Sequence, residues 1–422
     1  MEGARPLDQG GGESAGAGGH LPVLDGLRGL AVLLVVLVHT REFEPTTWVG
    51  RGLDAVMRSG WMGVDLFFVL SGFLITGILL RAKTAAPRGD AGKARHRWEG
   101  YLKPFLMRRV LRVLPLYYAV LVVVFWVIPM LPMEGASVYA GLAEHQGWFW
   151  LHLSNVHFAL HGLTGDPTDV MWSLAVEEQF YLLWPMVVWW VPARWLGRVC
   201  AGLVVTAVVL RVVALGTGVV GGVGVYVLPF MRMDALAFGA WLAVWRLRGG
   251  RVSGWWAGVG VVGSLVGLVV LGLLRGGLYF LDPWVQGVGF VLLGVLFVSV
   301  MGVATARDGR RTWVHVLVDR RWLRVLGKYS YAIYLLHQLV KSVLWNLGLS
   351  SSVVPEVWGS PLPGQVVWTG LVLGATLGLA WVSWHVLEAP CLRLKRRYPY
   401  AEAGGGRGDA ADQPRRAVGP AG

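Results

Sequence analysis

The stretch LDGLRGLAVLLVVLVH, residues 24–39, decides the fold. With its flanking residues, this apolar run is long enough to cross the hydrocarbon core of a bilayer, which takes about 20 residues of α-helix. Three ionisable side chains interrupt the run: Asp25 and Arg28 near its start, and His39 at its end. Ionisable groups within a membrane span cost free energy, so each is a candidate for function. Because no small-residue cleavage site follows, we expect an uncleaved membrane-spanning helix here.

Similar apolar blocks recur along the chain. Of its 422 residues, 55% are hydrophobic and 15% are charged, whereas a soluble domain carries about 25% charged residues. We therefore predict an all-α, polytopic transmembrane helix bundle of about ten helices. The predicted helices cover residues 22–40, 61–81, 112–130, 172–191, 199–215, 226–246, 255–274, 284–303, 329–348 and 366–387. They form one membrane domain, residues 21–398, between Gly- and Ala-rich tails, residues 1–20 and 399–422, that we predict to be disordered cytoplasmic segments.

The basic residues fall in alternate loops between these blocks. Residues 81–112 contain ten Lys or Arg and residues 304–328 contain seven, whereas residues 131–170 and 348–364 contain none. Cytoplasmic loops carry such an excess of Lys and Arg. We therefore predict a multi-pass protein of the plasma (cytoplasmic) membrane with both termini in the cytoplasm. Because topology accounts for the net charge of +13, we predict no nucleic-acid partner.

The cysteines and the loop histidines do not indicate a metal centre. Cys200 lies in an apolar block and Cys391 beside a basic loop, so they suggest neither a disulfide framework nor a zinc site. His157 and His161 have a spacing that fits one helix face and a metal ion, but ordinary loop histidines explain them better. We predict no metal and no permanently bound cofactor.

Arg28 and His39 share one face of the first predicted helix. Ten residues separate them, so they lie about 16 Å apart along the helix axis and within about 20° of the same direction. Taken alone, they also fit a snorkelling cation and an interfacial histidine. The further embedded polar groups favour a functional site instead.

Polar residues recur in or beside the other predicted spans. They are Asp65, Arg108, Arg109, Arg112, Glu177, Glu178, Tyr181, Arg232, Asp234, His337 and Glu388. Arg109 and Arg112 are three residues apart and share a helix face. Arginine binds phosphate through paired hydrogen bonds. We therefore interpret the arginine cluster as a clamp for a polyphosphate, with a positive-inside cluster as the alternative.

The embedded acids suggest where the chemistry lies. Glu177 and Glu178 are adjacent within an apolar span, a place where acids are expensive and usually functional. Arg232 and Asp234 are expected to neutralise partners across the bundle. Arginines at the inner interface, with a histidine and carboxylates deeper in the bilayer, indicate a substrate with a charged head and a long reactive arm. Acyl-coenzyme A has that shape.

Several motifs in order resemble one known family. They are LDGLRGLAVLLVVLVH (24–39), GVDLFFVLSGFLI (63–75), RRVLRVLPLY (108–117), MWSLAVEEQFYLLWP (171–185), RMDALAFG (232–239), YSYAIYLLH (329–337) and LEAP (387–390). The chain resembles the acyltransferase-3 family of bacterial membrane O-acyltransferases from about residue 21 to residue 390. It is similar to the stand-alone members, which have no C-terminal esterase-like domain.

The resemblance implies an activity and some of its residues. The family moves acyl groups from acyl-CoA to hydroxyls. By resemblance, His39 is the catalytic histidine, and Arg28, Arg109, Arg112 and Glu388 match the family's other functional polar positions. The expected reaction transfers an acetyl or another short acyl group from acyl-CoA, as co-substrate, to a hydroxyl of a carbohydrate, a glycolipid or a glycosylated or polyketide natural product. The alternative is a membrane transporter or flippase for a glycolipid or natural product.

The residue types also predict a mechanism. A free hydroxyl is a poor nucleophile near neutral pH, so the transfer needs a base, and His39 is the best candidate. We expect an embedded carboxylate to orient its imidazole, with Glu177 as the first choice and Asp65 as the second. Direct transfer in a ternary complex is expected, and an acyl-histidine intermediate is the alternative.

Overall fold

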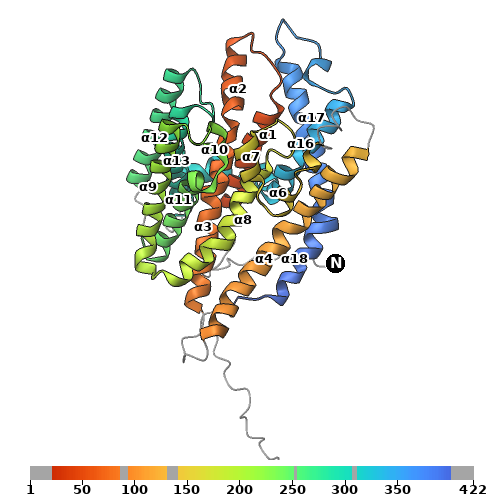
Figure 1. Cartoon of the computed structure of the whole chain (residues 1–422). Helices are drawn as coiled ribbons and strands as arrows, with labels where there is room; N and C mark the ends of the chain where they lie inside the picture. The colour runs from red at the N-terminus through yellow and green to blue at the C-terminus, as the bar shows by residue number, and fades with distance from the viewer. Residues whose placement is uncertain (1–20, 86–93, 131–140, 251–253, 307–310, 401–422) are drawn as a thin grey trace, which may run out of the picture.

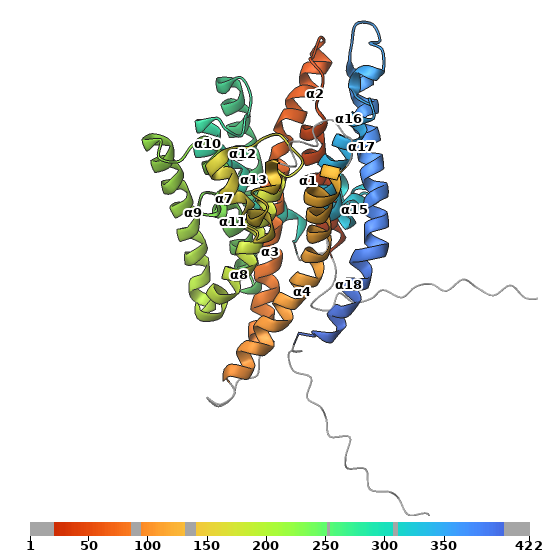
Figure 2. The ribbon, with the colours of Figure 1, turned by 45° about the vertical axis from the view of Figure 1, so that its right-hand side comes forward.

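The described part of the molecule is a bundle of helices. The computed structural model describes residues 21–85, 94–130, 141–250, 254–306 and 311–400. The only non-helical pairing in these residues is an isolated bridge between Val357 and Ser360. Figures 1 and 2 show long helices running in roughly one direction, with α2 and the loop before α17 at the upper end and the start of α4 at the lower end. The predicted tails 1–20 and 401–422 lie outside the described residues.

The helices follow one another along the chain with short connections. They are α1 (Pro22–Thr40), α2 (Trp48–Arg58), α3 (Met62–Ala85), α4 (Ala94–Val122), α6 (Gly147–Trp150), α7 (Ser154–His161), α8 (Met171–Trp190), α9 (Ala193–Thr217), α10 (Gly222–Val227), α11 (Pro229–Leu247), α12 (Gly254–Arg275), α13 (Phe290–Ala304), α14 (Trp313–Val318), α15 (Arg321–Lys328), α16 (Ser330–Asn346), α17 (Leu362–Ser383) and α18 (Ala389–Arg393). Single π-helical turns extend α4 over Val123–Val127, precede α13 over Val285–Gly289 and follow α17 over Trp384–Glu388.

Membrane-spanning character is confirmed for the bundle. Among the described residues, eight helical segments are long and apolar enough to cross a bilayer. The other two predicted spans form α8 and α16. The α16 helix has only 17 residues, and α8 carries Glu177 and Glu178. The two helices that fail a simple hydropathy criterion are therefore two that carry embedded polar residues.

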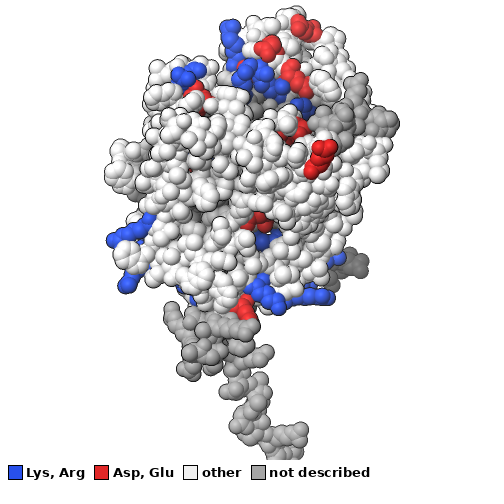
Figure 3. Space-filling model, in the orientation of Figure 1, with Lys and Arg blue, Asp and Glu red and all other residues white. Residues whose placement is uncertain are grey.

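Several helices are longer than their apolar cores. The prediction began the third span at residue 112, whereas α4 begins at Ala94. Hydropathy detects only the apolar part of a helix, and the backbone hydrogen bonds of α4 continue through the basic residues that precede it. Figure 3 shows the resulting surface, a broad band almost free of charged side chains between charged groups at the upper and lower ends.

Glycines let two pairs of helices approach closely. On α3 and α11, a Cβ atom at Gly72 would lie 2.0 Å from the carbonyl oxygen of Leu236, and one at Gly239 would lie 1.9 Å from that of Val69. The α1–α15 pair is equally close, because a Cβ at Gly327 would lie 1.8 Å from the carbonyl oxygen of Asp25. Small residues serve this purpose in membrane bundles. These contacts fix α1, α3 and α11 relative to one another, and α1 and α3 both contribute to the cavity described below.

The variant Gly239→Ala is expected to lower stability. Its methyl group would meet backbone atoms that cannot move aside by a rotamer change, and overpacking of this kind costs about 1–3 kcal/mol. Gly374→Ala on α17 is the matched control, since nothing lies within 4 Å of its Cβ position. Thermal unfolding in detergent should show a lower midpoint for Gly239→Ala and none for the control. Equal midpoints for the two variants would mean that the α3–α11 approach is looser than described.

Candidate active site

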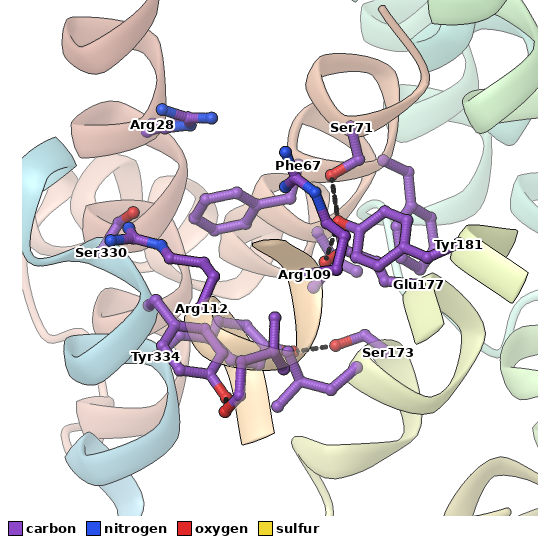
Figure 4. Close-up of a pocket in the computed structure, with 15 residues that line it drawn as sticks. Arg28, Phe67, Ser71, Arg109, Arg112, Ser173, Glu177, Tyr181, Ser330 and Tyr334 are labelled. Carbon is purple, nitrogen blue, oxygen red and sulfur yellow. Dashed lines mark hydrogen bonds between the residues drawn. The ribbon is translucent and has the colours of Figure 1, made fainter. Parts of the chain in front are cut away.

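A cavity lies between α1, α3, α4, α8 and α16, and we call it the arginine cavity (Figure 4). Its volume is about 110 Å³. Its polar lining consists of Arg28, Ser71, Arg109, Arg112, Ser173, Glu177, Tyr181, Ser330, Tyr331 and Tyr334. Five helices that are distant in sequence therefore bring three arginines and one carboxylate to a single space.

The three arginines leave cationic groups available in this cavity. Arg109 and Arg112 have no carboxylate oxygen within 4 Å among the described residues, and the buried Nε of Arg109 has no hydrogen-bond partner. Arg109 lies over the ring of Tyr181, 5.7 Å from its centroid. Arg28 is bonded to Asp25 at 3.3 Å. Buried donors without partners are costly, so the arrangement fits an anionic ligand with several oxygens.

Arg108 does not belong to this group, and its predicted place in the clamp is wrong. Its guanidinium donates hydrogen bonds to the carbonyl oxygens of Lys395 and Tyr398, at 3.2 and 3.0 Å. It also lies over the ring of Tyr400. Successive residues of a helix point about 100° apart, so Arg108 faces the C-terminal segment while Arg109 faces the cavity.

Glu177 is the acceptor of a small hydrogen-bond network. Its Oε1 accepts a hydrogen bond from Ser71 at 2.6 Å, and its Oε2 accepts one from Tyr181 at 3.2 Å. The Tyr181 hydroxyl also lies 3.3 Å from the Ser71 oxygen. Glu178, the next residue of α8, does not line the cavity. The two adjacent acids therefore have different surroundings, and only Glu177 faces the arginines.

His39 pairs with a second histidine. Its Nδ1 lies 2.8 Å from the carbonyl oxygen of Val35 and 3.1 Å from Nε2 of His337. The Nδ1 of His337 in turn faces the carbonyl oxygen of Tyr334 at 2.8 Å. Carbonyl oxygens only accept, so the neutral tautomers carry their protons on both Nδ1 atoms. Nε2 of His39 then has a free lone pair and no hydrogen-bond partner among the described residues.

The prediction that Glu177 or Asp65 orients His39 is wrong. Glu177 is bonded to Ser71 and Tyr181. Asp65 forms a buried ion pair with Arg232 at 2.7 Å. A buried carboxylate needs a paired cation or hydrogen-bond donors, and each acid finds them away from His39. The group that meets the imidazole is His337.

The expected neutralisation across the bundle is present. Arg232 pairs with Asp65 of α3, and Asp234 pairs with Arg211 of α9 at 2.6 Å. All four side chains are buried. These ion pairs tie α3, α9 and α11 together and do not line the cavity. The prediction missed Arg211, although a charged residue in an apolar block is itself a signal of a buried partner.

Two further predicted positions lie at the margins of the cavity. Glu388 is buried and interacts electrostatically with Arg112, which lies 5.7 Å above the ring of Trp384. His337 lies three residues after Tyr334, whose hydroxyl is 2.6 Å from that of Ser173. Tyr334 thus connects the cavity wall to the histidine pair. The described residues include no cluster of three or more side chains with the geometry of a metal site.

A pocket at the upper end lies next to the histidine pair, and we call it the upper pocket. It has a volume of about 360 Å³ and is lined by Glu42, Lys341, Ser342, Trp345 and Asn346. Lys341 follows His337 by four residues, about 6 Å along α16. Its Nζ lies 4.0 Å from Glu42. Burial raises the pKa of the Glu42 carboxyl, and the Lys341 ammonium lowers it. The sequence prediction did not include this pocket.

Comparison with known proteins supports an acyl-transfer role for this arrangement. The chain is 27% identical over 391 residues to the peptidoglycan O-acetyltransferase OatA of Listeria monocytogenes, covering 88% of this chain and 56% of that protein. It is 29% identical over 392 residues to a putative peptidoglycan O-acetyltransferase, YrhL, of Bacillus subtilis, covering 88% and 55%. A putative O-acetyltransferase of Staphylococcus aureus strain COL is 27% identical over 384 residues.

The chain therefore spans about half the length of the curated relatives it matches. No solved structure matches it. A family model described as an acyltransferase domain matches residues 21–385, which include every helix that lines the arginine cavity. This chain is a multi-pass membrane acyltransferase that belongs to the acyltransferase-3 family.

Proposed function

We propose that the protein transfers an acetyl or another short acyl group from acyl-CoA to a hydroxyl of a carbohydrate-containing acceptor in the plasma membrane. One observation carries the proposal. Arg28, Arg109 and Arg112 converge on one cavity, and His39 lies about 16 Å further along α1. An anion site and an imidazole with a free nitrogen are thereby aligned on one helix.

The donor is proposed to enter with its phosphates at the arginines. Arginine fits phosphate oxygens through paired hydrogen bonds. The pantetheine arm then extends along α1 toward His39. The cavity of about 110 Å³ is much smaller than coenzyme A, so the proposal includes a widening of the space between α1, α4 and α16 when the donor binds. The excess of Lys and Arg in the lower loops supports a cytoplasmic lower end.

The proposed chemistry is direct transfer with His39 as the base. Nε2 of His39 takes the proton of the acceptor hydroxyl while that oxygen forms a bond to the thioester carbon. The carbon–sulfur bond then breaks, and the imidazolium returns the proton to the departing thiolate of coenzyme A. His337 holds His39 in the required tautomer through the contact at Nδ1. It is a positioning residue and does not touch the reacting atoms.

The acceptor is proposed to bind in the upper pocket. Trp345 offers an aromatic face, and Glu42, Lys341, Ser342 and Asn346 offer polar groups, a combination that suits a sugar. Acceptor and donor then reach His39 from opposite ends of the bundle. The Listeria relative is named for acetylation of peptidoglycan, so a peptidoglycan disaccharide fragment is the first acceptor to try.

The proposal is tested with the purified protein in proteoliposomes. Acyl-CoA is supplied with a panel of acceptors, namely a peptidoglycan disaccharide, a glycolipid and a glycosylated polyketide, and free thiol is measured. Release of coenzyme A that depends on one acceptor, with an ester on that acceptor by mass spectrometry, is the expected result. Absence of any acceptor-dependent release across the panel would overturn the proposed reaction.

The upper pocket makes a separate prediction. Trp345→Ala should raise the Michaelis constant for the acceptor, because sugar–aromatic contact is lost, and should leave the constant for acyl-CoA unchanged. A stacking contact of about 1 kcal/mol predicts roughly a fivefold change. Trp358→Ala is the control, since Trp358 is 99% exposed in the loop before α17 and does not line the pocket. Equal acceptor constants for both variants would rule out this binding place.

A further inference from the structure

A third cavity lies between α9 and α11, apart from the proposed active site, and we call it the Trp/Arg groove. Its volume is about 740 Å³. It is lined by three arginines and three tryptophans, namely Arg194, Trp195, Arg198, Trp241, Trp245 and Arg248. It opens near the start of α9 and the end of α11, so it lies at one end of two membrane spans.

The arginines of this groove are cations without acidic neighbours. None of the three has a carboxylate oxygen within 4 Å in the part of the chain that the structure describes. All three are exposed. Arg198 lies 4.4 Å above the ring of Trp195, so its flat face is covered while its N–H edge stays free to bind. Three such guanidinium groups around one space suit an anion that carries several oxygens.

The rest of the groove is apolar and faces the bilayer. Trp241 and Trp245 are one turn apart on α11, and their rings stack at 5.6 Å. On α9, Gly197 and Ala201 contribute almost no side chain, and this leaves the space open. Only 22% of the apolar window of α9 is buried, so its outer face is available to hydrocarbon chains. The groove therefore offers cations at a helix end and apolar walls beside them.

The structure assigns this groove as a binding site for the phosphate headgroup of an anionic phospholipid. The headgroup phosphate lies between the arginines, and the acyl chains run along the tryptophans and α9. Basic pockets between transmembrane helices recognise lipids in this way, and tryptophan favours the membrane interface. A free phosphate shares the headgroup chemistry but does not use the apolar walls. The assignment does not depend on the acyl-transfer proposal.

Native mass spectrometry of the full chain, released from detergent, tests the assignment. Phosphatidylglycerol and phosphatidylcholine are titrated separately, with inorganic phosphate and coenzyme A as competitors. The wild type should retain phosphatidylglycerol in preference to phosphatidylcholine. The variant R194Q/R198Q/R248Q should bind phosphatidylglycerol about tenfold or more weakly, since hydrogen bonds to charged groups are lost. The control R311Q/R320Q/R321Q removes three exposed arginines outside the groove and should bind like wild type.

Three outcomes would overturn the assignment. The first is equal retention of the two lipids by the wild type. The second is an equal loss of phosphatidylglycerol in the groove variant and in the control, which would indicate a general charge effect. The third is displacement of the lipid by inorganic phosphate or coenzyme A, which would indicate a site for a free phosphate compound. Since all six substituted residues are exposed, both variants should elute from a sizing column like wild type.

Discussion

His39→Ala is expected to lower acyl transfer by about 10²- to 10⁴-fold, the usual contribution of a general base. Acyl-CoA binding should remain nearly unchanged, because the arginines that hold the phosphates are about 16 Å away along α1. Transfer is measured as acylated product by mass spectrometry, and binding is measured by titration with acyl-CoA. The expected pattern is therefore loss of turnover without loss of donor affinity.

A matched control exists for this substitution. His385 places its Nδ1 2.8 Å from the carbonyl oxygen of Trp381, four residues earlier, as His39 does with Val35. It lies near the end of α17 and lines none of the three cavities. His385→Ala should therefore keep full activity. If His39→Ala, folded and in the membrane, transfers acyl groups at a rate close to that of the control, His39 is structural.

Arg109→Ala is expected to raise the Michaelis constant for acyl-CoA roughly 10- to 100-fold, since charge-assisted hydrogen bonds contribute about 1.5–3 kcal/mol each. Arg112→Ala should act in the same direction. The constant for the acceptor should change little, because the upper pocket contains neither residue. Initial rates at varied acyl-CoA and fixed acceptor give the measurement.

The neighbouring Arg108 provides a sharp control for the arginine prediction. It carries the same charge on the same turn of α4 but bonds to Lys395 and Tyr398 outside the cavity. Arg108→Ala should therefore leave the acyl-CoA constant close to that of wild type. A similar rise in both variants would mean that overall positive charge attracts the donor. An unchanged constant in Arg109→Ala would remove the arginine from the proposed donor site.

The fold was largely predictable because the bilayer imposes a length on each apolar block. All ten predicted spans correspond to helices, including α8 and α16, which carry the polar residues. Short helices such as α2 and α7 were not predicted, since they contain less than one span of apolar sequence. Helix boundaries were less accurate where polar residues continue a helix, as at the start of α4.

The candidate site was predictable residue by residue but not contact by contact. Embedded ionisable groups identify themselves by their cost, so Arg28, Glu177 and His39 could all be found in the sequence. Their partners depend on how helices pack across the bundle. The pairing of His39 with His337, and of Asp65 with Arg232, joins residues 298 and 167 positions apart, and no local pattern encodes such a contact.

The central claim is covalent transfer, and one measurement tests it most directly. Proteoliposomes receive acyl-CoA that carries an isotopic label in the acyl group, together with the acceptor, and the acceptor is analysed by mass spectrometry with wild-type protein and with His39→Ala. The account predicts a labelled ester on the acceptor with the wild type and almost none with the variant. Movement of unmodified acceptor across the membrane, with no label on it, would contradict the account and favour a transporter.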